Sequence, residues 1–203
     1  VEVLCVNDGS SDKTEQVVRQ YTDRKSQLYD SRVRYFSQRN RGKPVAVNRG
    51  INEMRGKYFT LLDADDLLTA KSISLRVQAL KSDPSAEVAI GGFDILDESD
   101  MHAGGRSCPD TEDPDYLRRA FYLAYKTPFH LCTCLIHRSI LERVGPFDPY
   151  LNRCQDGDYA IRCMGATKGV TTVNESVYLY RKHRHSVRSR IKMRLKTARY
   201  RPY

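Results

Sequence analysis

The segment Lys57-Tyr58-Phe59-Thr60-Leu61-Leu62-Asp63-Ala64-Asp65-Asp66 decides the fold class of this chain. Its mostly apolar first part predicts a buried strand over residues 57–62, and three carboxylates follow where that strand ends. Ligands of open α/β sheets bind outside the carboxyl ends of the strands, so these acids mark a candidate site. Carboxylates this close repel one another, and oxygen ligands suit Mg²⁺ or Mn²⁺. A solvated acidic turn that caps the next helix stays open as the alternative.

The same alternation of strand, loop and helix continues on both sides of this segment. Nearly continuous apolar strands separated by helices indicate an α/β fold with a mostly parallel sheet that is covered by helices on both faces. Residues 97–114 are expected to form a long loop or a weak hairpin. The expected strands cover residues 1–6, 33–36, 57–62, 87–93, 130–137 and 170–180; the expected helices begin near Asp12 and at Pro44 and cover 67–80, 115–126, 139–144 and 156–165.

The formal charge of +9 belongs to the C-terminus of the 203-residue chain. Residues 1–180 carry 24 Lys and Arg against 25 Asp and Glu, whereas residues 181–203 carry 10 Lys and Arg and no acid. The stretch 186–203 is therefore expected to form a basic amphipathic helix or tail. Six cysteines in a chain large enough for an apolar core favour a reducing compartment. The sequence shows neither a signal peptide nor an apolar run approaching the ~18 residues of a membrane span.

Two more acid-bearing loops accompany the first. Asn7-Asp8-Gly9-Ser10 follows the first predicted strand, and Cys154-Gln155-Asp156-Gly157-Asp158 opens a predicted helix. Three acidic segments expected at one mouth of the sheet are hard to explain as helix caps alone. They indicate a site for a cation and an anionic ligand.

With these segments in this order, the sequence resembles the family 2 glycosyltransferases of the GT-A fold. The resemblance covers residues 1 to about 187 and rests on six segments rather than on one. The segments are Val6-Asn-Asp-Gly-Ser-Ser-Asp-Lys-Thr14, Asn40-x-Gly42-Lys43-x-x-Ala46-x-Asn48-x-Gly50, Leu62-Asp-Ala-Asp-Asp66, Arg138-x-x-Leu141-x-x-Val144-Gly145-x-Phe147-Asp148, Gln155-Asp-Gly-Asp-x-x-Ile161-Arg162 and Tyr180-Arg181-x-His183-x-x-Ser186.

The resemblance implies an enzyme that transfers a sugar from a nucleotide-diphosphate donor, with UDP favoured, to a hydroxyl of a glycan or lipid-linked glycan of the cell envelope. It implies inversion and assistance by Mn²⁺ or Mg²⁺. By the match, Asp65 would ligate the metal, Asp156 would be the catalytic base and Asp158 the fallback base. The nucleotide-sugar-binding residues would be Asp8 at the nucleobase, Lys43, Asn48, Asp63 at the ribose or at the metal through water, Asp66, and Arg181, His183 and Ser186 over the diphosphate.

Simpler roles stay open for several of these residues. Lys43 could be a solvated loop residue, and Asp158 could be an acid favoured at a helix N-terminus. The segment from Arg181 could simply begin the basic tail.

The sequence also departs from the family pattern. The first strand and helix of the family are absent ahead of the Asp8 segment, and Gln155 stands in place of a glutamate. We expect an N-terminally incomplete GT-A domain over residues 1–185, followed by the tail. The alternative is a truncated, catalytically inactive module that acts as a binding or scaffold domain.

The basic tail suggests a surface partner. Residues 187–203 are expected to contact an anionic membrane surface, which implies a cytoplasmic protein peripheral to the inner face of the membrane. Nucleic acid is not expected as a partner, because no nucleic-acid-binding motif accompanies the charge.

One metal-like pattern is set aside. His130, Cys132, Cys134 and His137 carry soft ligands, but on a strand the first three would share one face and His137 would lie on the other. A packed strand is therefore favoured over a zinc site, which needs closed tetrahedral geometry.

Overall fold

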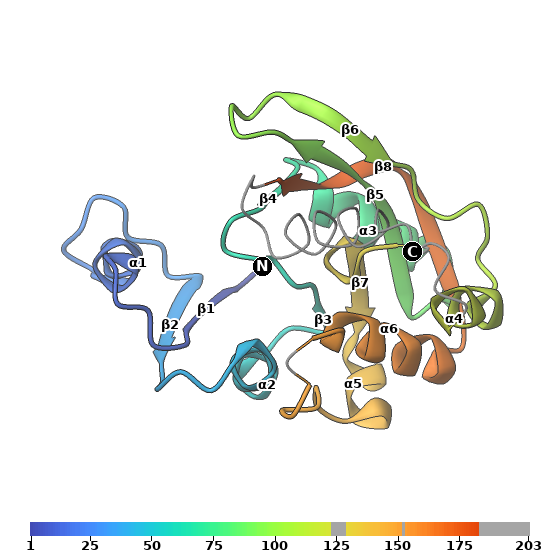
Figure 1. Ribbon diagram of the computed structural model, residues 1–203, viewed down its shortest axis with the longest axis horizontal. Coiled ribbons are helices and arrows are strands. Elements are labelled where there is room, and N and C mark those ends of the chain that lie inside the picture. The colour runs from blue at the N-terminus through green and yellow to red at the C-terminus, as the bar shows by residue number, and fades with distance from the viewer. Residues whose placement is uncertain (123–128, 152, 183–203) are drawn as a thin grey trace, which may run out of the picture.

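A computed structural model describes residues 1–122, 129–151 and 153–182, and Figure 1 shows their arrangement. The N-terminal part is a βαβ unit. Strands β1 (Val3–Asn7) and β2 (Val33–Ser37) pair in parallel, and helix α1 (Thr14–Thr22) connects them. A parallel pair needs such a crossover. Helix α2 (Lys43–Glu53) then packs against β1 and leads toward the larger sheet.

The larger sheet is built around two long neighbouring strands. Strands β5 (Val88–Leu96) and β8 (Val170–Arg181) pair in parallel, with register shifts at Gly91 and Gly92. The strand order is β3-β7-β5-β8-β4, and β6 pairs with β5. The outer strands are β3 (Tyr58–Phe59), β4 (Leu67–Leu68), β6 (His102–Arg106) and β7 (Cys134–His137).

The α/β class predicted from the sequence is confirmed, but the prediction of a mostly parallel sheet is wrong for the larger sheet. Among the strands in the described ranges, only β1·β2 and β5·β8 pair in parallel, and the other four pairs are antiparallel. Strand β4 follows β3 through a turn, with no helix between them, whereas β7 follows helix α4 (Pro114–Tyr122) and a 3₁₀ turn. An apolar run predicts burial on both faces, and it does not fix strand direction.

Helices cover both faces of the larger sheet (Figure 1). Val88 and Ile90 of β5 pack with the helices on one face, while Ala89, between them, packs with α3 on the other. This alternation follows from the two-residue period of a strand. The helices of the first face are α4 (Pro114–Tyr122), α5 (Arg138–Val144) and α6 (Gln155–Ala166); α3 (Ser72–Ser82) covers the second.

Three predicted elements differ from those observed. The predicted helix 67–80 begins only at Ser72, because Leu67 and Leu68 pair with β8 as strand β4. The predicted strand 57–62 is reduced to the two-residue strand Tyr58–Phe59, which pairs with the last residues of β7. The predicted strand 130–137 begins with the 3₁₀ helix η1 (Leu131–Thr133), which leaves β7 only four residues. The weak hairpin, one of two readings of 97–114, is present as β5 and β6.

The tail and the predicted domain boundary at residue 185 lie outside the described residues.

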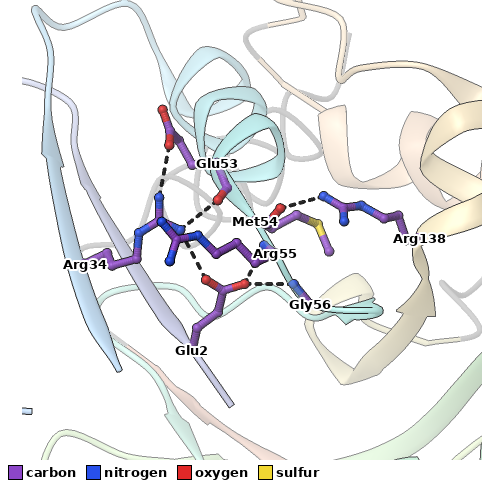
Figure 2. Close-up of polar contacts among 7 residues, drawn as sticks. All are labelled: Glu2, Arg34, Glu53, Met54, Arg55, Gly56 and Arg138. Atoms are coloured by element: carbon purple, nitrogen blue, oxygen red, sulfur yellow. Dashed lines mark hydrogen bonds and ion pairs between the residues drawn. The ribbon is translucent and has the colours of Figure 1, made fainter. Parts of the chain in front are cut away.

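The N-terminal unit and the larger sheet meet at the C-terminal end of α2 (Figure 2). The Glu2 carboxylate accepts hydrogen bonds from the backbone N–H of Arg55 (2.6 Å) and Gly56 (2.9 Å). Arg34 donates to Glu2 and to the Glu53 carbonyl oxygen (2.8 Å), and Arg138 donates to the Met54 carbonyl oxygen. This network fixes the turn at residues 54–56, which precedes β3 and the acidic residues that follow β3.

The Glu2 network gives a testable pH dependence. Burial opposes ionisation of Glu2, but the N–H groups of Arg55 and Gly56 and the Arg34 guanidinium outweigh it and lower the pKa. A carboxyl with a lowered folded-state pKa stabilises the fold above its unfolded pKa, and this contribution is lost as pH falls through the folded pKa. Glu2→Gln should therefore lower the free energy of unfolding at neutral pH by about 1–3 kcal/mol and flatten its decline below about pH 5, as measured by urea unfolding.

Glu142→Gln is the matched control, because it removes one exposed carboxylate from α5. An acid dependence of Glu2→Gln that equals the wild-type dependence would contradict the assignment.

Candidate functional site

A lysine shared by two carboxylates is the centre of the candidate site. Lys43 is the first residue of α2, Asp63 follows β3, and Asp156 lies in the first turn of α6. The Lys43 Nζ lies 2.7 Å from Asp63 Oδ1 and 3.5 Å from Asp156 Oδ2. All three side chains are about two-thirds buried, with 30–35% of their surface exposed. Three sequence-distant motifs thus converge on one ion cluster.

The electrostatics of this cluster keep Lys43 charged. Burial lowers its pKa, but the charges of Asp156 and Asp63 and the hydrogen bond that Lys43 donates to Asp63 outweigh burial and raise the pKa overall. Asp156 Oδ1 is buried and has no hydrogen-bond partner within the described residues. A carboxylate in the first turn of a helix is favoured by the helix dipole. Asp156 therefore offers an uncommitted oxygen next to a fixed cation.

Asp8 holds the loop that presents Lys43. Its carboxylate accepts hydrogen bonds from Gln38 Nε2 (2.8 Å) and from the backbone N–H of Arg41 (3.0 Å) and Gly42 (2.8 Å). The Gly9 backbone, at φ +79°, lies close to the Asn40 backbone. A Cβ on residue 9 would lie 2.8 Å from the Asn40 nitrogen, so only glycine allows this contact. Asp8 thus holds the loop that ends at Lys43, and its contact with the nucleobase stays a prediction.

Asn48 also binds the protein rather than facing open space. Its Nδ2 donates to the Phe147 carbonyl oxygen (2.8 Å), and its Oδ1 accepts from the Phe147 N–H (2.7 Å). This pair fastens α2 to the segment between α5 and α6. The sequence motifs that contain Asn48 and Phe147 are therefore joined by two hydrogen bonds from a side chain to the backbone.

The three acids after β3 differ in environment. Asp63 bonds to Lys43, Asp65 is exposed, and Asp66 is only 5% exposed. Asp66 accepts hydrogen bonds from the Tyr178 hydroxyl and from the Arg181 N–H, which lies 2.7 Å away. Asp66 therefore anchors the end of β8, and these two bonds favour a positioning role over the predicted contact with the donor.

Arg181 extends from the end of β8 over the acidic loop. Its guanidinium donates to the Asp65 carbonyl oxygen (2.8 Å) and to Asp100 Oδ1 (2.8 Å). Arg181 thus lies beside the acidic loop, and its contact with the diphosphate stays a prediction. His183 and Ser186, predicted with it, lie outside the described residues.

Asp158 differs from Asp156 because its carboxylate is bonded to an arginine of the same helix. It bonds to Arg162 one turn later at 2.8 Å, and Arg162 also donates to the Val144 carbonyl oxygen (2.7 Å). This ion pair within α6 supports the structural alternative for Asp158.

His130 belongs to the soft-metal pattern of the sequence, and three members of that pattern have different surroundings in the structure. His137 accepts a hydrogen bond from the Ser139 N–H and caps α5, whereas Cys134 lies in the core. His130 instead stacks on Tyr178, which bonds to Asp66. In the sequence, His130 stands out only as a polar residue in an apolar segment. No motif spacing connects it with Asp66 or with the other acidic residues.

Comparison with known proteins places this site in a family context. The sequence model of "Glycosyl transferase family 2" matches residues 1–145. The chain is 31% identical over 160 residues to the uncharacterized glycosyltransferase RT0329 of Rickettsia typhi, covering 78% of this chain and 48% of the relative. It is 24% identical over 196 residues to the uncharacterized glycosyltransferase MJ1057 of Methanocaldococcus jannaschii, covering 94% and 63%. The chain thus spans about half the length of the first relative.

Solved structures show the same fold. S. aureus TarS 1–349 in complex with UDP-GlcNAc matches with a TM-score of 0.71 at 16% identity, over 91% of this chain and 50% of that one. TarS 1–349 alone matches with a TM-score of 0.70 at 15% identity, over 89% and 51%. This likeness establishes the GT-A fold predicted from the sequence. Because the family match covers more than half of the residues, the chain belongs to glycosyl transferase family 2.

Proposed function

We propose that this chain binds a nucleotide-diphosphate sugar at the Lys43–Asp63–Asp156 cluster and transfers the sugar, with inversion, to an acceptor hydroxyl. The observation that carries the proposal is Asp156, whose Oδ1 is buried without a partner in the described chain while Lys43 holds the other oxygen. A catalytic base must be an ionised group within reach of the attacking hydroxyl. Asp156 combines an oxygen without a partner among the described residues with a cation, Lys43, that lies 3.5 Å from its other oxygen.

The proposed reaction uses three protein groups. Asp156 accepts the proton of the acceptor hydroxyl as its oxygen attacks the anomeric carbon from the face opposite the leaving group. The bond from that carbon to the diphosphate oxygen breaks, and the diphosphate leaves with the electron pair. Lys43 lies where its charge would stabilise the departing diphosphate, and Arg181 lies beside the same loop.

The residues after β3 fit a divalent cation. Asp65 is exposed and Asp63 is partly exposed, and both offer carboxylate oxygens of the kind that Mg²⁺ and Mn²⁺ prefer. Within the described ranges, no three His, Cys, Asp or Glu side chains form a metal-binding group, so the diphosphate would complete the ligand set. Asp65 would hold the ion directly and Asp63 through water. When bound, such an ion neutralises charge on the diphosphate.

A solved structure of similar fold supports the proposed donor, and the family resemblance supports the proposed acceptor. The TarS structure with UDP-GlcNAc supports a UDP-sugar as the donor class for this chain as well. The acceptor proposed from the family resemblance is a glycan or lipid-linked glycan. No helix in the described part of the chain is long and apolar enough to cross a membrane. Contact of residues 187–203 with an anionic membrane stays a prediction, because those residues lie outside the described ranges.

Calorimetric titration with UDP-GlcNAc, with and without Mn²⁺, tests the proposal. We expect saturable binding that requires Mn²⁺ and that weakens at least about tenfold in Lys43→Gln, because a charge-assisted contact to phosphate is lost. Lys71→Gln, a change at an exposed lysine before α3, is the control and should bind as the wild type does. Failure of the wild type to bind any UDP-, GDP- or TDP-sugar would overturn the proposal.

A further inference from the structure

His130 is a histidine enclosed by aromatic rings beside the acidic site. Its ring stacks on Tyr178 at a centroid distance of 5.7 Å and an interplanar angle of 24°, and it lies 6.0 Å from Tyr180 and 6.3 Å from Phe93. Thr133 donates from both its N–H (2.9 Å) and its hydroxyl (2.7 Å) to the His130 carbonyl oxygen. The ring is thus held on its faces and at its backbone.

The polar edge of this ring is not satisfied. His130 Nδ1 is buried and has no hydrogen-bond partner within the described residues. The Tyr178 hydroxyl, the polar group of the ring that stacks on it, already donates to Asp66. A buried polar atom without a partner is destabilising, so a phenylalanine would suit this aromatic enclosure better if packing were the only requirement. The missing partner points to a ligand.

His130 lies within electrostatic range of the proposed site. Burial is the main influence on its pKa and lowers it; Asp156 and Asp63 act in the opposite direction, and Lys43 acts with burial. The ring is therefore neutral at neutral pH, with one nitrogen that donates and one that accepts. In addition, η1, which follows His130 directly, packs against α6, the helix whose first turn holds Asp156. The His130 imidazole and the proposed base Asp156 thus lie on neighbouring elements of the fold.

We propose that His130 is a positioning residue that binds a sugar hydroxyl through its imidazole nitrogen and holds that sugar next to Asp156. The inference rests on the proposed function and adds a residue that recognises the sugar itself rather than the nucleotide. A sugar ring presents hydroxyls, which both donate and accept, and its apolar face suits the neighbouring aromatic side chains. The hydroxyl can belong to the donor sugar or to the acceptor, and kinetics separates the two.

Two substitutions in the full chain test this role. His130→Phe keeps the aromatic packing against Tyr178, Tyr180 and Phe93 and removes the nitrogen. His130→Asn loses the ring but places an amide close to the position of Nδ1. Initial rates with a UDP-sugar and acceptor, measured over a range of each substrate, give kcat and both KM values, and thermal unfolding reports stability.

We expect His130→Phe to fold with unchanged or raised stability and to raise one KM by about tenfold or more, as for loss of a hydrogen bond to a substrate hydroxyl. A raised donor KM assigns the hydroxyl to the donor sugar, and a raised acceptor KM assigns it to the acceptor. His130→Asn should recover at least part of that KM despite poorer packing.

Two results would overturn the inference. One is a His130→Phe variant whose kcat and KM values stay within twofold of wild type. The other is an asparagine variant that is worse than phenylalanine in both stability and KM, because that order follows packing rather than hydrogen bonding. Absence of both donor binding and turnover in the wild type would instead remove the proposed function, and this inference with it.

Discussion

Asp156→Asn is expected to lower kcat for sugar transfer by about 10²–10⁴-fold while donor binding changes little. The amide has nearly the shape of the carboxylate and keeps an oxygen for Lys43, which lies 3.5 Å from Oδ2 in the wild type. It cannot accept a proton from the attacking hydroxyl, so the loss falls on the chemical step. The measurement is release of UDP from a UDP-sugar in the presence of acceptor, with donor affinity measured separately by calorimetry.

Asp158→Asn is the matched control, two residues later on the same helix. Its carboxylate bonds to Arg162, so the expected effect is a modest loss of stability with kcat within about tenfold of wild type. Equal loss of kcat in the two variants, or a larger loss in Asp158→Asn, would contradict the assignment of Asp156 as the base.

Asp66→Ala is expected to lower the free energy of unfolding by about 2–4 kcal/mol. Asp66 is buried and satisfies both the Tyr178 hydroxyl and the Arg181 N–H. Removing the carboxylate leaves two polar groups at the end of β8 without their acceptor. Chemical unfolding followed by circular dichroism gives the free energy directly.

The neighbouring Asp65→Ala has the opposite expected profile. Asp65 is exposed, so its removal should change stability by no more than about 0.5–1 kcal/mol. It should abolish Mn²⁺-dependent binding of UDP-GlcNAc, since Asp65 is the proposed direct ligand. A stable Asp66→Ala, or an Asp65→Ala that binds the donor with Mn²⁺ as wild type does, would contradict the division of roles within this loop.

Local sequence patterns predicted most elements of the fold but not how the strands pair. The apolar runs at β1, β2 and β5 and the proline at the start of α2 are local signals, and the structure bears them out. Strand direction depends on which distant segments meet, and β7 pairs antiparallel with β3 and β5 although helix α4 precedes it in the chain. Leu67 and Leu68 match a helical pattern, yet pairing with β8 prevails over local preference.

The candidate site shows a similar limit. Residue types predicted that the segments of Asp63 and Asp156 meet at one mouth of the sheet, and the family resemblance added Lys43. The three side chains do meet. The same reasoning could not tell that Asn48 would clamp the Phe147 backbone, because a side chain's partner depends on tertiary packing. For the same reason, the adjacent Asp65 and Asp66 read alike in the sequence, although one is exposed and the other buried.

Turnover of a UDP-sugar by the wild-type chain tests the central claim most directly. With Mn²⁺ and a glycan acceptor, we expect steady release of UDP that stops with a metal chelator, resumes with added Mn²⁺ and is lost in Asp156→Asn. Donor binding without any turnover would instead indicate an inactive binding module. Turnover by Asp156→Asn at the wild-type rate would contradict the account of the site.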